Sequence, residues 1–311
     1  MTVDVAINVY GKPFQTAVAL LSLMRHSGEH INKIYFVKEP KQPGSINFDF
    51  ISDLLPDKLI VHTPTYWHWY DRTVAAKLAE EEYRRSLRYQ YAWEESSADY
   101  LFVTHNDVLY HGDIVGDFLA NIGDSVAIGE IGQCWNCPAH TAQLCSSDRY
   151  SDFRPSHHEL LKLYREHPTN RVGWEQFVDD KSPWPLPECR INEWAALIDL
   201  AVSKPETIPL GDAFPFGGLT LDVGTRWFRD MASKGYSFVH RSIAGLASHG
   251  WAAGGAGHQA LFQYDKYELG EAAAYSMLVT DFGVDESVLA NVSGGKWRTR
   301  LQTLIRKTPE R

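Results

Sequence analysis

The chain has 311 residues, of which 44% are hydrophobic and 22% charged, and its formal net charge is -9. This composition indicates a globular chain of one large or two small domains and excludes a disordered or low-complexity protein. The acidic balance argues against a nucleic-acid-binding protein, which needs a basic face. No apolar run approaches the roughly 20 residues that cross a bilayer, and no basic segment precedes an apolar run at the N-terminus. We therefore expect a soluble, cytoplasmic protein without a secretory signal.

The first 130 residues alternate segments that favour strands with segments that favour helices. Residues 3–9 are a β-rich run that stops at Tyr10-Gly11, and Pro13 suits the first turn of the helix that follows. Further along, the sequence predicts strands at 33–37, 58–62, 99–104 and 125–129, a long helix over 72–95 and a helix over 114–122. This alternation predicts an α/β fold with a mainly parallel sheet flanked by helices, in which ligands bind beyond the carboxyl ends of the strands.

The irregular stretch from 131 to 190 holds all four cysteines of the chain, Cys134, Cys137, Cys145 and Cys189. The two-residue gap between Cys134 and Cys137 lets both thiolates reach one ion, and the other two cysteines would complete a tetrahedral structural zinc site. Two alternatives stay open: four buried thiols that pack as small apolar side chains, or a redox-active pair. We expect an irregular cysteine-containing insertion that zinc holds to the main domain.

The second half of the chain favours helices and has a basic end. A helix is predicted over 192–201 with Asn192 as its N-cap, and another over 225–233 before a strand at 236–240. From 294 onward the residues are mostly basic and amphipathic, so this tail could rest on anionic lipid, bind a partner or fray. We divide the chain into four parts, 1–130, 131–190, 191–285 and 286–311.

Three segments, taken in order, resemble the glycosyltransferases of the GT-A fold, closest to the family 2 type. Residues 3–28 resemble the family's first strand, nucleotide-contacting turn and first helix, and residues 98–113 the strand that ends in its metal-binding DxD motif. Residues 221–238 resemble the segment that carries the catalytic base. The resemblance implies an enzyme that moves a sugar from a nucleoside diphosphate sugar to a glycan, lipid-linked or small-molecule acceptor. We expect this enzyme in the cytoplasm. If the basic tail binds lipid, the enzyme would lie at the inner face of the membrane.

The position of the DxD motif reads His105-Asn106-Asp107, so histidine replaces the first carboxylate. By resemblance, Asp107 binds the Mn or Mg ion that neutralises the donor diphosphate, and His105 adds an imidazole that suits Mn. His249, at the start of the glycine-rich stretch 249–258, matches a late histidine of the family that binds the metal or the diphosphate. The alternative for residues 105–107 is a polar turn at the end of a strand.

Asp222 occupies the position of the family's base, the carboxylate that takes the proton of the acceptor hydroxyl during inverting transfer. Its alternative role is a helix N-cap, and Glu193, also expected at a helix start, is the second candidate base. A retaining mechanism stays open. The residues that the resemblance assigns to the nucleotide are Val9, Tyr10, Glu39, Arg88 and Asn106.

Two further assignments have alternatives. Arg88, expected on the helix before the strand at 99–104, suits a solvated helix face as well as a phosphate. The aromatic run 66–70 would either line a sugar- or base-binding cleft or fill a core.

Two rival functions remain. A nucleotidyltransferase that makes an activated sugar would need a glycine-rich, lysine-bearing loop after the first strand, where this chain has only Tyr10-Gly11-Lys12-Pro13. A non-catalytic relative that binds nucleotide or glycan would explain the missing first aspartate. It would bind the nucleotide without turning over the donor.

Overall fold

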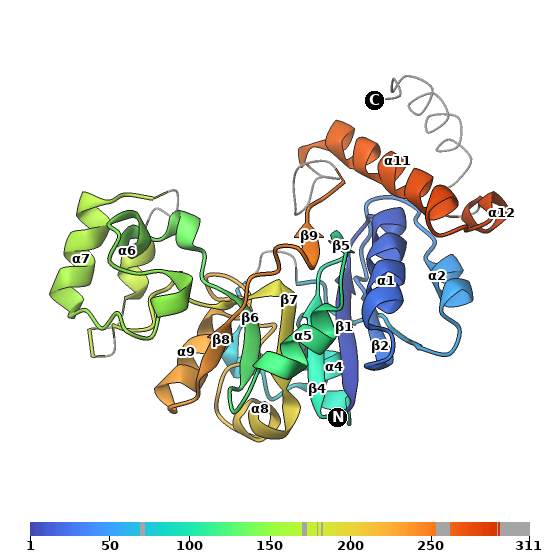
Figure 1. The fold of residues 1–311 in the computed structure, drawn as a ribbon. Coiled ribbons are helices and arrows are strands. Elements are labelled where there is room, and N and C mark those ends of the chain that lie inside the picture. The colour runs from blue at the N-terminus through green and yellow to red at the C-terminus, as the bar shows by residue number, and fades with distance from the viewer. Residues whose placement is uncertain are drawn as a thin grey trace.

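The computed structural model describes residues 1–68, 72–169, 173–178, 180–181, 183–252, 262–290 and 292. Its centre is a seven-stranded sheet with the strand order β3-β2-β1-β4-β7-β6-β8 (Figure 1). Its strands are β1 Val3–Val9, β2 Ile31–Lys38, β3 Leu59–His62, β4 Tyr100–Thr104, β6 Ala127–Ile131, β7 Ile191–Asp199 and β8 Phe238–His240. A small second sheet pairs β5 Val108–Tyr110 with β9 Ala247–His249.

Most strands of the large sheet run parallel. β1 pairs in parallel with β2 and β4, β2 with β3, and β6 with β8, whereas β7 runs antiparallel to β4 and to β6. Every residue of β1 except Asn8 is buried, as expected for a central strand that is covered by helices on both faces. The prediction of a mainly parallel sheet flanked by helices is therefore confirmed.

Helices cover both faces of this sheet. The helices are α1 Pro13–Ser27, α2 Asp49–Leu54, α3 Glu81–Arg85, α4 Gln90–Glu95, α5 Ile114–Asn121, α6 Pro138–Thr141, α7 His157–Glu166, α8 Leu200–Glu206, α9 Thr225–Ser233, α11 Tyr264–Thr280 and α12 Glu286–Leu289. Strand side chains alternate between the two faces. Phe102 of β4 belongs to the core that also contains residues of α1, α5 and α11, whereas Leu101 and Val103 pack with Trp93 of α4 and Trp227 of α9.

The helix predicted over 192–201 is wrong, because the chain forms β7 there and begins α8 only afterwards. β7 is buried on both faces between β4 and β6, so its apolar residues do not alternate with polar ones, and the sequence pattern resembles that of a buried helix. The cap of α8 is Asp199, whose carboxylate accepts a hydrogen bond from the amide of Val202 at 3.0 Å; it is not Asn192.

The long helix predicted over 72–95 is also wrong. This region contains a 3-10 turn at Ala75–Lys77 followed by the short helices α3 and α4. The break before α4 lies at Tyr89, which has a left-handed φ of 62° and whose amide donates to Oδ1 of Asn8 at 3.0 Å. Arg88 therefore lies in the turn that precedes α4 instead of on a helix.

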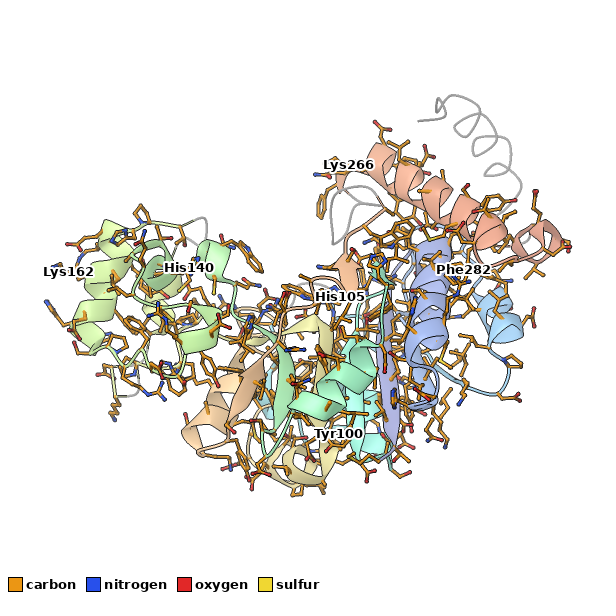
Figure 2. The ribbon with its side chains drawn as sticks, in the orientation of Figure 1. Tyr100, His105, His140, Lys162, Lys266 and Phe282 are labelled. Atoms are coloured by element: carbon orange, nitrogen blue, oxygen red, sulfur yellow. The ribbon has the colours of Figure 1, made fainter. Side chains whose placement is uncertain are left out.

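The segment between β6 and β7, residues 132–190, is set to one side of the sheet and is called here the cysteine lobe (Figure 1). Among the described residues of the lobe, the regular elements are α6, α7 and three 3-10 turns, Cys134–Asn136, Ser147–Arg149 and Trp174–Phe177. Figure 2 shows His140 and Lys162 in this lobe and His105 near the sheet. Among the described residues, each helix is too short or too polar to span a bilayer. The predicted basic tail from 294 and residues 253–258 of the glycine-rich stretch lie outside the described residues.

A buried carboxylate joins α11 to the start of α1. Glu271 accepts hydrogen bonds from the amides of Phe14 and Gln15 at 2.9 and 3.3 Å, so it caps the first turn of α1. Burial raises the pKa of Glu271 to about 7, against the lowering effect of these amides. Because the folded-state pKa lies above the ordinary value, this group stabilises the fold most below about pH 4.5, and its contribution is lost as the pH rises through 7.

We expect Glu271→Gln to remove this pH dependence. Between about pH 5 and pH 8 the wild-type chain loses up to about 3 kcal/mol of stability through Glu271, and the glutamine variant does not. Urea unfolding of both proteins at the two pH values measures the difference, in which the contributions of all other titratable groups cancel. Equal pH dependence of the two proteins would contradict the assignment.

Candidate functional site

Polar residues gather where three parallel strands of the large sheet end. Tyr10 and Lys12 follow β1, Glu39 follows β2, and residues 105–107 follow β4. These residues surround a cavity of about 80 Å³, called here the polar cavity. It is lined by Asn8, Tyr10, Lys12, Glu39, Arg88, Tyr89, His105, Asn106 and Asp107. Most of the residues that the sequence assigns to nucleotide and metal therefore border one space.

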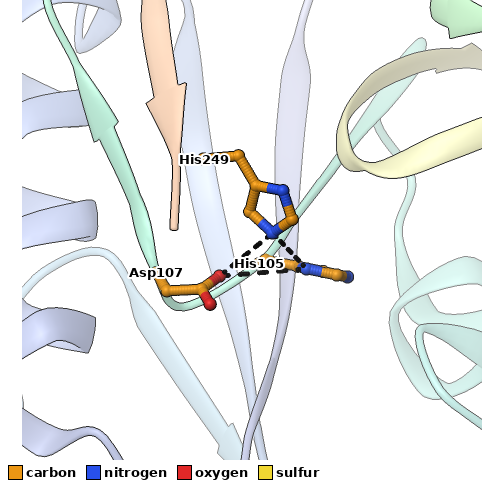
Figure 3. A group of neighbouring side chains, drawn as sticks. All are labelled: His105, Asp107 and His249. Carbon is orange, nitrogen blue, oxygen red and sulfur yellow. Dashed lines mark hydrogen bonds and ion pairs between the residues drawn. The ribbon is translucent and has the colours of Figure 1, made fainter. Parts of the chain in front are cut away.

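His105, Asp107 and His249 form a compact triad beside this cavity (Figure 3). Nδ1 of His105 lies 3.2 Å from Nε2 of His249, and Oδ1 of Asp107 lies 3.4 Å from Nε2 of His249 and 3.9 Å from Nδ1 of His105. His249 reaches the other two because β9 pairs with β5, where Val108 faces His249 in the register. The pairing of two three-residue strands thus completes the triad.

The triad has the chemistry and spacing of a cation site. Oδ1 of Asp107 is buried and has no hydrogen-bond partner within the described structure, and two imidazole nitrogens face it. Two ligands in neighbouring positions around an ion, each about 2.1 Å from it, lie about 3 Å apart, close to the spacing of the first two contacts. Two imidazoles with one carboxylate suit Mn better than Mg, which prefers oxygen ligands throughout. These three residues can therefore hold a divalent metal ion.

Lys12 is a functional candidate that the sequence analysis did not identify. Its Nζ lies 2.7 Å from Oδ2 of Asp107, and both side chains are almost fully buried. The chain turns sharply here, because Gly11 and Lys12 both have left-handed φ values of 61° and 55°. A non-glycine residue in this conformation is strained, and such strain concentrates at functional sites. The signal in the sequence was a lysine in the turn at the carboxyl end of β1.

The carboxylate of Asp107 is held in its charged form. Burial alone would raise the pKa of Asp107, but the Lys12 ammonium, together with His249 and His105, holds it well below its ordinary value. The side chain is thus an anion at neutral pH, as a metal ligand must be.

Glu193 and Asp222, the two candidate bases, belong to one network centred on Arg190. The buried guanidinium of Arg190 is hydrogen-bonded to Glu193 and lies 3.5 Å from Oδ2 of Asp222. Oε1 of Glu193 lies 3.4 Å from Nε2 of His105, which links the network to the triad. Asp222 also accepts a hydrogen bond at 2.7 Å from Nε2 of Gln133. Arg190 and Gln133 were not among the candidates from sequence.

The two candidate bases differ in their surroundings. Glu193 lies on β7, not at a helix start, and is fully buried. Burial would raise the pKa of Glu193, but Arg190 and then His105 hold it well below the ordinary value. Asp222 precedes α9 as expected, and its side chain retains 24% of its exposure. Of the two, Asp222 is the carboxylate that a second substrate can reach.

The remaining nucleotide candidates differ in position. Val9 has its side chain in the core, and its carbonyl oxygen accepts hydrogen bonds from the amide of Glu39 and from Gln42, both at 3.0 Å. Asn106 donates to the carbonyl oxygen of Gly11 at 3.2 Å and so holds the turn after β1. Burial raises the pKa of Glu39, against the effects of Arg88 and Asn8. Val9 therefore shapes the turn, whereas Glu39 and Arg88 border the cavity.

Part of the aromatic run at 66–70 lies beside this cavity. The rings of Tyr10 and Trp67 are stacked with centroids 6.2 Å apart, and Nζ of Lys41 lies 4.7 Å from the Trp67 ring. Residues 69 and 70 lie outside the described residues. Trp67 thus extends the rim of the cavity with an aromatic face of the kind that stacks on bases and sugars.

The four cysteines surround one small cavity in the cysteine lobe, together with His140 and Glu188. All four are free thiols, and burial raises the pKa of Cys137 to about 12 and that of Cys145 to about 11. Among the described residues, the groups with at least three ligand atoms within 4.8 Å of one another are the triad and Glu29, His30 and Asp113. The four thiols border the same cavity, but no three of them lie within 4.8 Å of one another in the described structure. Zinc binding therefore stays a prediction.

Elemental analysis of the untagged protein tests this prediction. We expect about one zinc per chain, and removal of the ion by a chelator should loosen the cysteine lobe. If the protein contains no zinc and has four reactive thiols after unfolding, the zinc site is contradicted. The cysteines would then be buried thiols that pack as small apolar side chains.

No protein-family model matches the sequence, and no curated protein matches it either. Similar solved structures include a mannosyltransferase from Pyrobaculum calidifontis in complex with GDP-Man and Mn2+, at 12% identity over 96% of this chain and 83% of that one, with a TM-score of 0.40. Mouse xyloside xylosyltransferase 1 has 15% identity over 78% of this chain and 85% of that one, with a TM-score of 0.41. Glucosyl-3-phosphoglycerate synthase from Mycobacterium tuberculosis, in complex with Mn2+, UDP and phosphoglyceric acid, has 8% identity over 88% and 78%, with a TM-score of 0.44. With TM-scores below 0.5, these likenesses identify neither the family nor the activity of this chain.

Proposed function

We propose that the chain is a glycosyltransferase that binds a nucleoside diphosphate sugar in the polar cavity and moves the sugar to an acceptor hydroxyl. This proposal rests on one observation: the polar cavity and the His105–Asp107–His249 triad lie side by side at the carboxyl ends of parallel strands. Parallel sheets bind their ligands at this edge. Its lining offers Tyr10 and Glu39 to a nucleoside, and Lys12 and Arg88 to phosphates.

A diphosphate leaving group needs positive charge around it. Lys12 and Arg88 border the cavity, and the triad would hold Mn or Mg, which when bound neutralises the charge that develops on the departing diphosphate. Lys12 also holds Asp107 in its charged form. The cavity therefore combines fixed cations with a site for a divalent one.

The acceptor hydroxyl must lose a proton as it attacks the sugar. Asp222 is the proposed base for an inverting transfer, because its carboxylate is reachable and Gln133 and Val223 fix its orientation through hydrogen bonds of 2.7 and 2.9 Å. Glu193 is buried between Arg190 and His105, so its proposed role is to position the imidazole of His105. The acceptor must reach Asp222, which lies in the part after residue 190.

The proposal extends to two features without a catalytic role. A structural zinc ion would bind in the small cavity of the cysteine lobe. The chain would work in the cytoplasm, with the basic tail from 294 reaching anionic lipid if the acceptor is lipid-linked.

A thermal-shift panel with UDP, GDP, dTDP and CMP, each with and without Mn or Mg, tests this function. A ligand at about 100 times its Kd stabilises the chain by about 2.7 kcal/mol, which raises the Tm by about 5 °C for a protein of this size. We expect a metal-dependent rise with one nucleoside diphosphate. His249→Asn should abolish the metal dependence, whereas His30→Asn, in the other His/acid group, should leave it intact.

Further arms of the panel separate the rival functions. A nucleotidyltransferase would respond to a nucleoside triphosphate with a sugar phosphate, and Lys12 beside the cavity makes this arm worth including. A binding-only relative would show the metal-dependent rise without release of the nucleoside diphosphate from a donor sugar. No response to any nucleotide would refute the proposed function.

A further inference from the structure

A second cavity, of about 490 Å³, lies outside the polar cavity and shares no residue with it. Its walls come from three separate parts of the chain: the loop at 72–73, the part of the cysteine lobe around Phe177 and 185–187, and residues 219–221 with α9. We call it the arginine pocket, after Arg72, Arg226 and Arg229 in its lining. None of the residues assigned to donor or metal borders it.

We infer that the arginine pocket binds the acceptor, and that the acceptor carries a phosphate or carboxylate group on an apolar body. The role of the ligand as an acceptor rests on the proposed function. The presence of a binding site for an anionic ligand depends only on the residues that line the pocket.

The described lining of the pocket is rich in arginine. Among the residues that the structure describes, three arginines and one carboxylate, that of Asp230, line the pocket, whereas the chain has a formal net charge of -9. Arg72 is exposed, its guanidinium lies 5.1 Å from the centre of the Phe177 ring, and no described carboxylate lies within ion-pair distance of it. Arg226 is 57% exposed and lies 3.6 Å from Asp230. Asp230 also accepts a hydrogen bond from the backbone amide of Phe214 at 2.9 Å, so its carboxylate is shared between this amide and Arg226.

Guanidinium groups recognise a particular chemistry. Their planar fork of N–H donors matches the oxygens of phosphate and carboxylate groups, with which they form paired, charge-assisted hydrogen bonds. A neutral sugar would instead need amide and hydroxyl partners on an aromatic face. Arg72 and Arg226 are exposed enough to turn toward a bound anion.

The rest of the lining is mostly apolar. Phe177, Leu186, Leu219 and Leu221 supply this surface, which suits a hydrocarbon or ring that bears the anionic group. Thr225 also borders the pocket, and its buried hydroxyl has no hydrogen-bond partner in the described structure. An unpaired buried hydroxyl destabilises the fold, and a hydrogen bond with a polar group of the ligand would relieve this cost.

The arginine pocket is adjacent in sequence to the proposed catalytic base. Leu221 borders the pocket, and the next residue is Asp222, the proposed base. From Asp222 the contacts continue through Arg190 and Glu193 to His105 of the triad. A ligand held in the pocket would therefore lie against the segment that carries the base, which is why we assign the pocket to the acceptor.

Binding of simple anions to the full-length protein tests the inference. Phenyl phosphate and benzoate are the anionic probes, and benzyl alcohol is the neutral one, all measured by calorimetry. We expect both anions to bind and the alcohol not to bind. The double variant Arg72→Gln/Arg226→Gln should weaken anion binding about tenfold or more, whereas Arg165→Gln, an exposed arginine of α7 outside the pocket, should not change it.

Two further arms identify the source of the anion and the meaning of a failure. Vesicles of phosphatidylcholine with and without phosphatidic acid distinguish a lipid phosphate from a soluble one. If the anion is a lipid phosphate, the wild-type protein should bind the vesicles that contain phosphatidic acid, and the double variant should not. Equal binding of benzyl alcohol, or unchanged binding of phenyl phosphate in the double variant, would overturn the inference. Nucleotide binding reports on the proposed function alone, because Arg72 and Arg226 do not border the polar cavity. If phenyl phosphate bound in the pocket and no nucleotide bound, both the acceptor role and the proposed function would be overturned.

Discussion

Asp107→Asn is expected to lower the rate of sugar transfer about a thousandfold and to abolish stabilisation by Mn. The carboxylate of Asp107 contributes one ligand of the triad through Oδ1, and the amide that replaces it carries no charge. When the leaving group is a nucleoside diphosphate, loss of the divalent ion removes several kcal/mol of transition-state stabilisation. A loss of about 4 kcal/mol lowers the rate about a thousandfold. Steady-state transfer assays and thermal shifts over a series of Mn concentrations measure the two effects.

Loss of stability must be separated from loss of metal binding in this variant. Asp107→Asn leaves the ammonium of Lys12 buried without its partner, which costs about 3–5 kcal/mol. The double variant Lys12→Met/Asp107→Asn removes both charges and should recover much of the stability without recovering metal binding. If the double variant were stabilised by Mn as strongly as the wild type, Asp107 would not be a ligand.

Lys12→Met alone gives the opposite result at the same site. It frees Oδ2 of Asp107 and removes a positive charge that repels a divalent ion, so Mn should raise its Tm more than that of the wild type. The protein without metal should be less stable, because Asp107 then lacks its partner. A reduced response to Mn would show that Lys12 supports the metal site instead of competing with the ion.

The sequence predicted the parts of the fold whose signals are local. β1, α1, β2, β4 and α9 were found because apolar runs or apolar periodicity marked them, with a proline, a glycine or a polar break close by. β7 was mistaken for a helix because a strand buried on both faces shows no alternation, so only its neighbours β4 and β6 define it. The break before α4 depends on a hydrogen bond between Tyr89 and Asn8, which are distant in sequence.

The candidate site followed from topology more than from single residues. Parallel strands end at one edge, so polar residues after β1, β2 and β4 had to meet. Lys12 was missed because its partner, Asp107, lies 95 positions away. The Arg190–Glu193 pair was missed because this segment was expected to begin a helix. In the structure Arg190 directly precedes β7 and Glu193 lies near the start of that strand. Such partners are visible only once the sheet order is known.

Asp222→Asn and Glu193→Gln should separate catalysis from stability. Asp222→Asn is expected to lower kcat by about a hundredfold to ten-thousandfold, because an amide cannot accept the proton of the acceptor hydroxyl. Its stability should stay close to that of the wild type, since the side chain is partly exposed and asparagine keeps a hydrogen-bond acceptor for Gln133. Donor binding should also be unchanged, because Asp222 does not border the polar cavity.

Glu193→Gln should behave in the reverse way. It leaves the buried guanidinium of Arg190 without its closest carboxylate, so we expect a loss of about 3–5 kcal/mol in unfolding free energy. Its kcat should fall less than that of Asp222→Asn, and the fall should be accompanied by weaker metal binding, because His105 loses the group that orients it. Urea unfolding, single-turnover transfer and Mn titration of both variants provide the comparison. If Glu193→Gln were stable but inactive while Asp222→Asn kept near-normal turnover, the base would be Glu193, and the buried network would be the catalytic one.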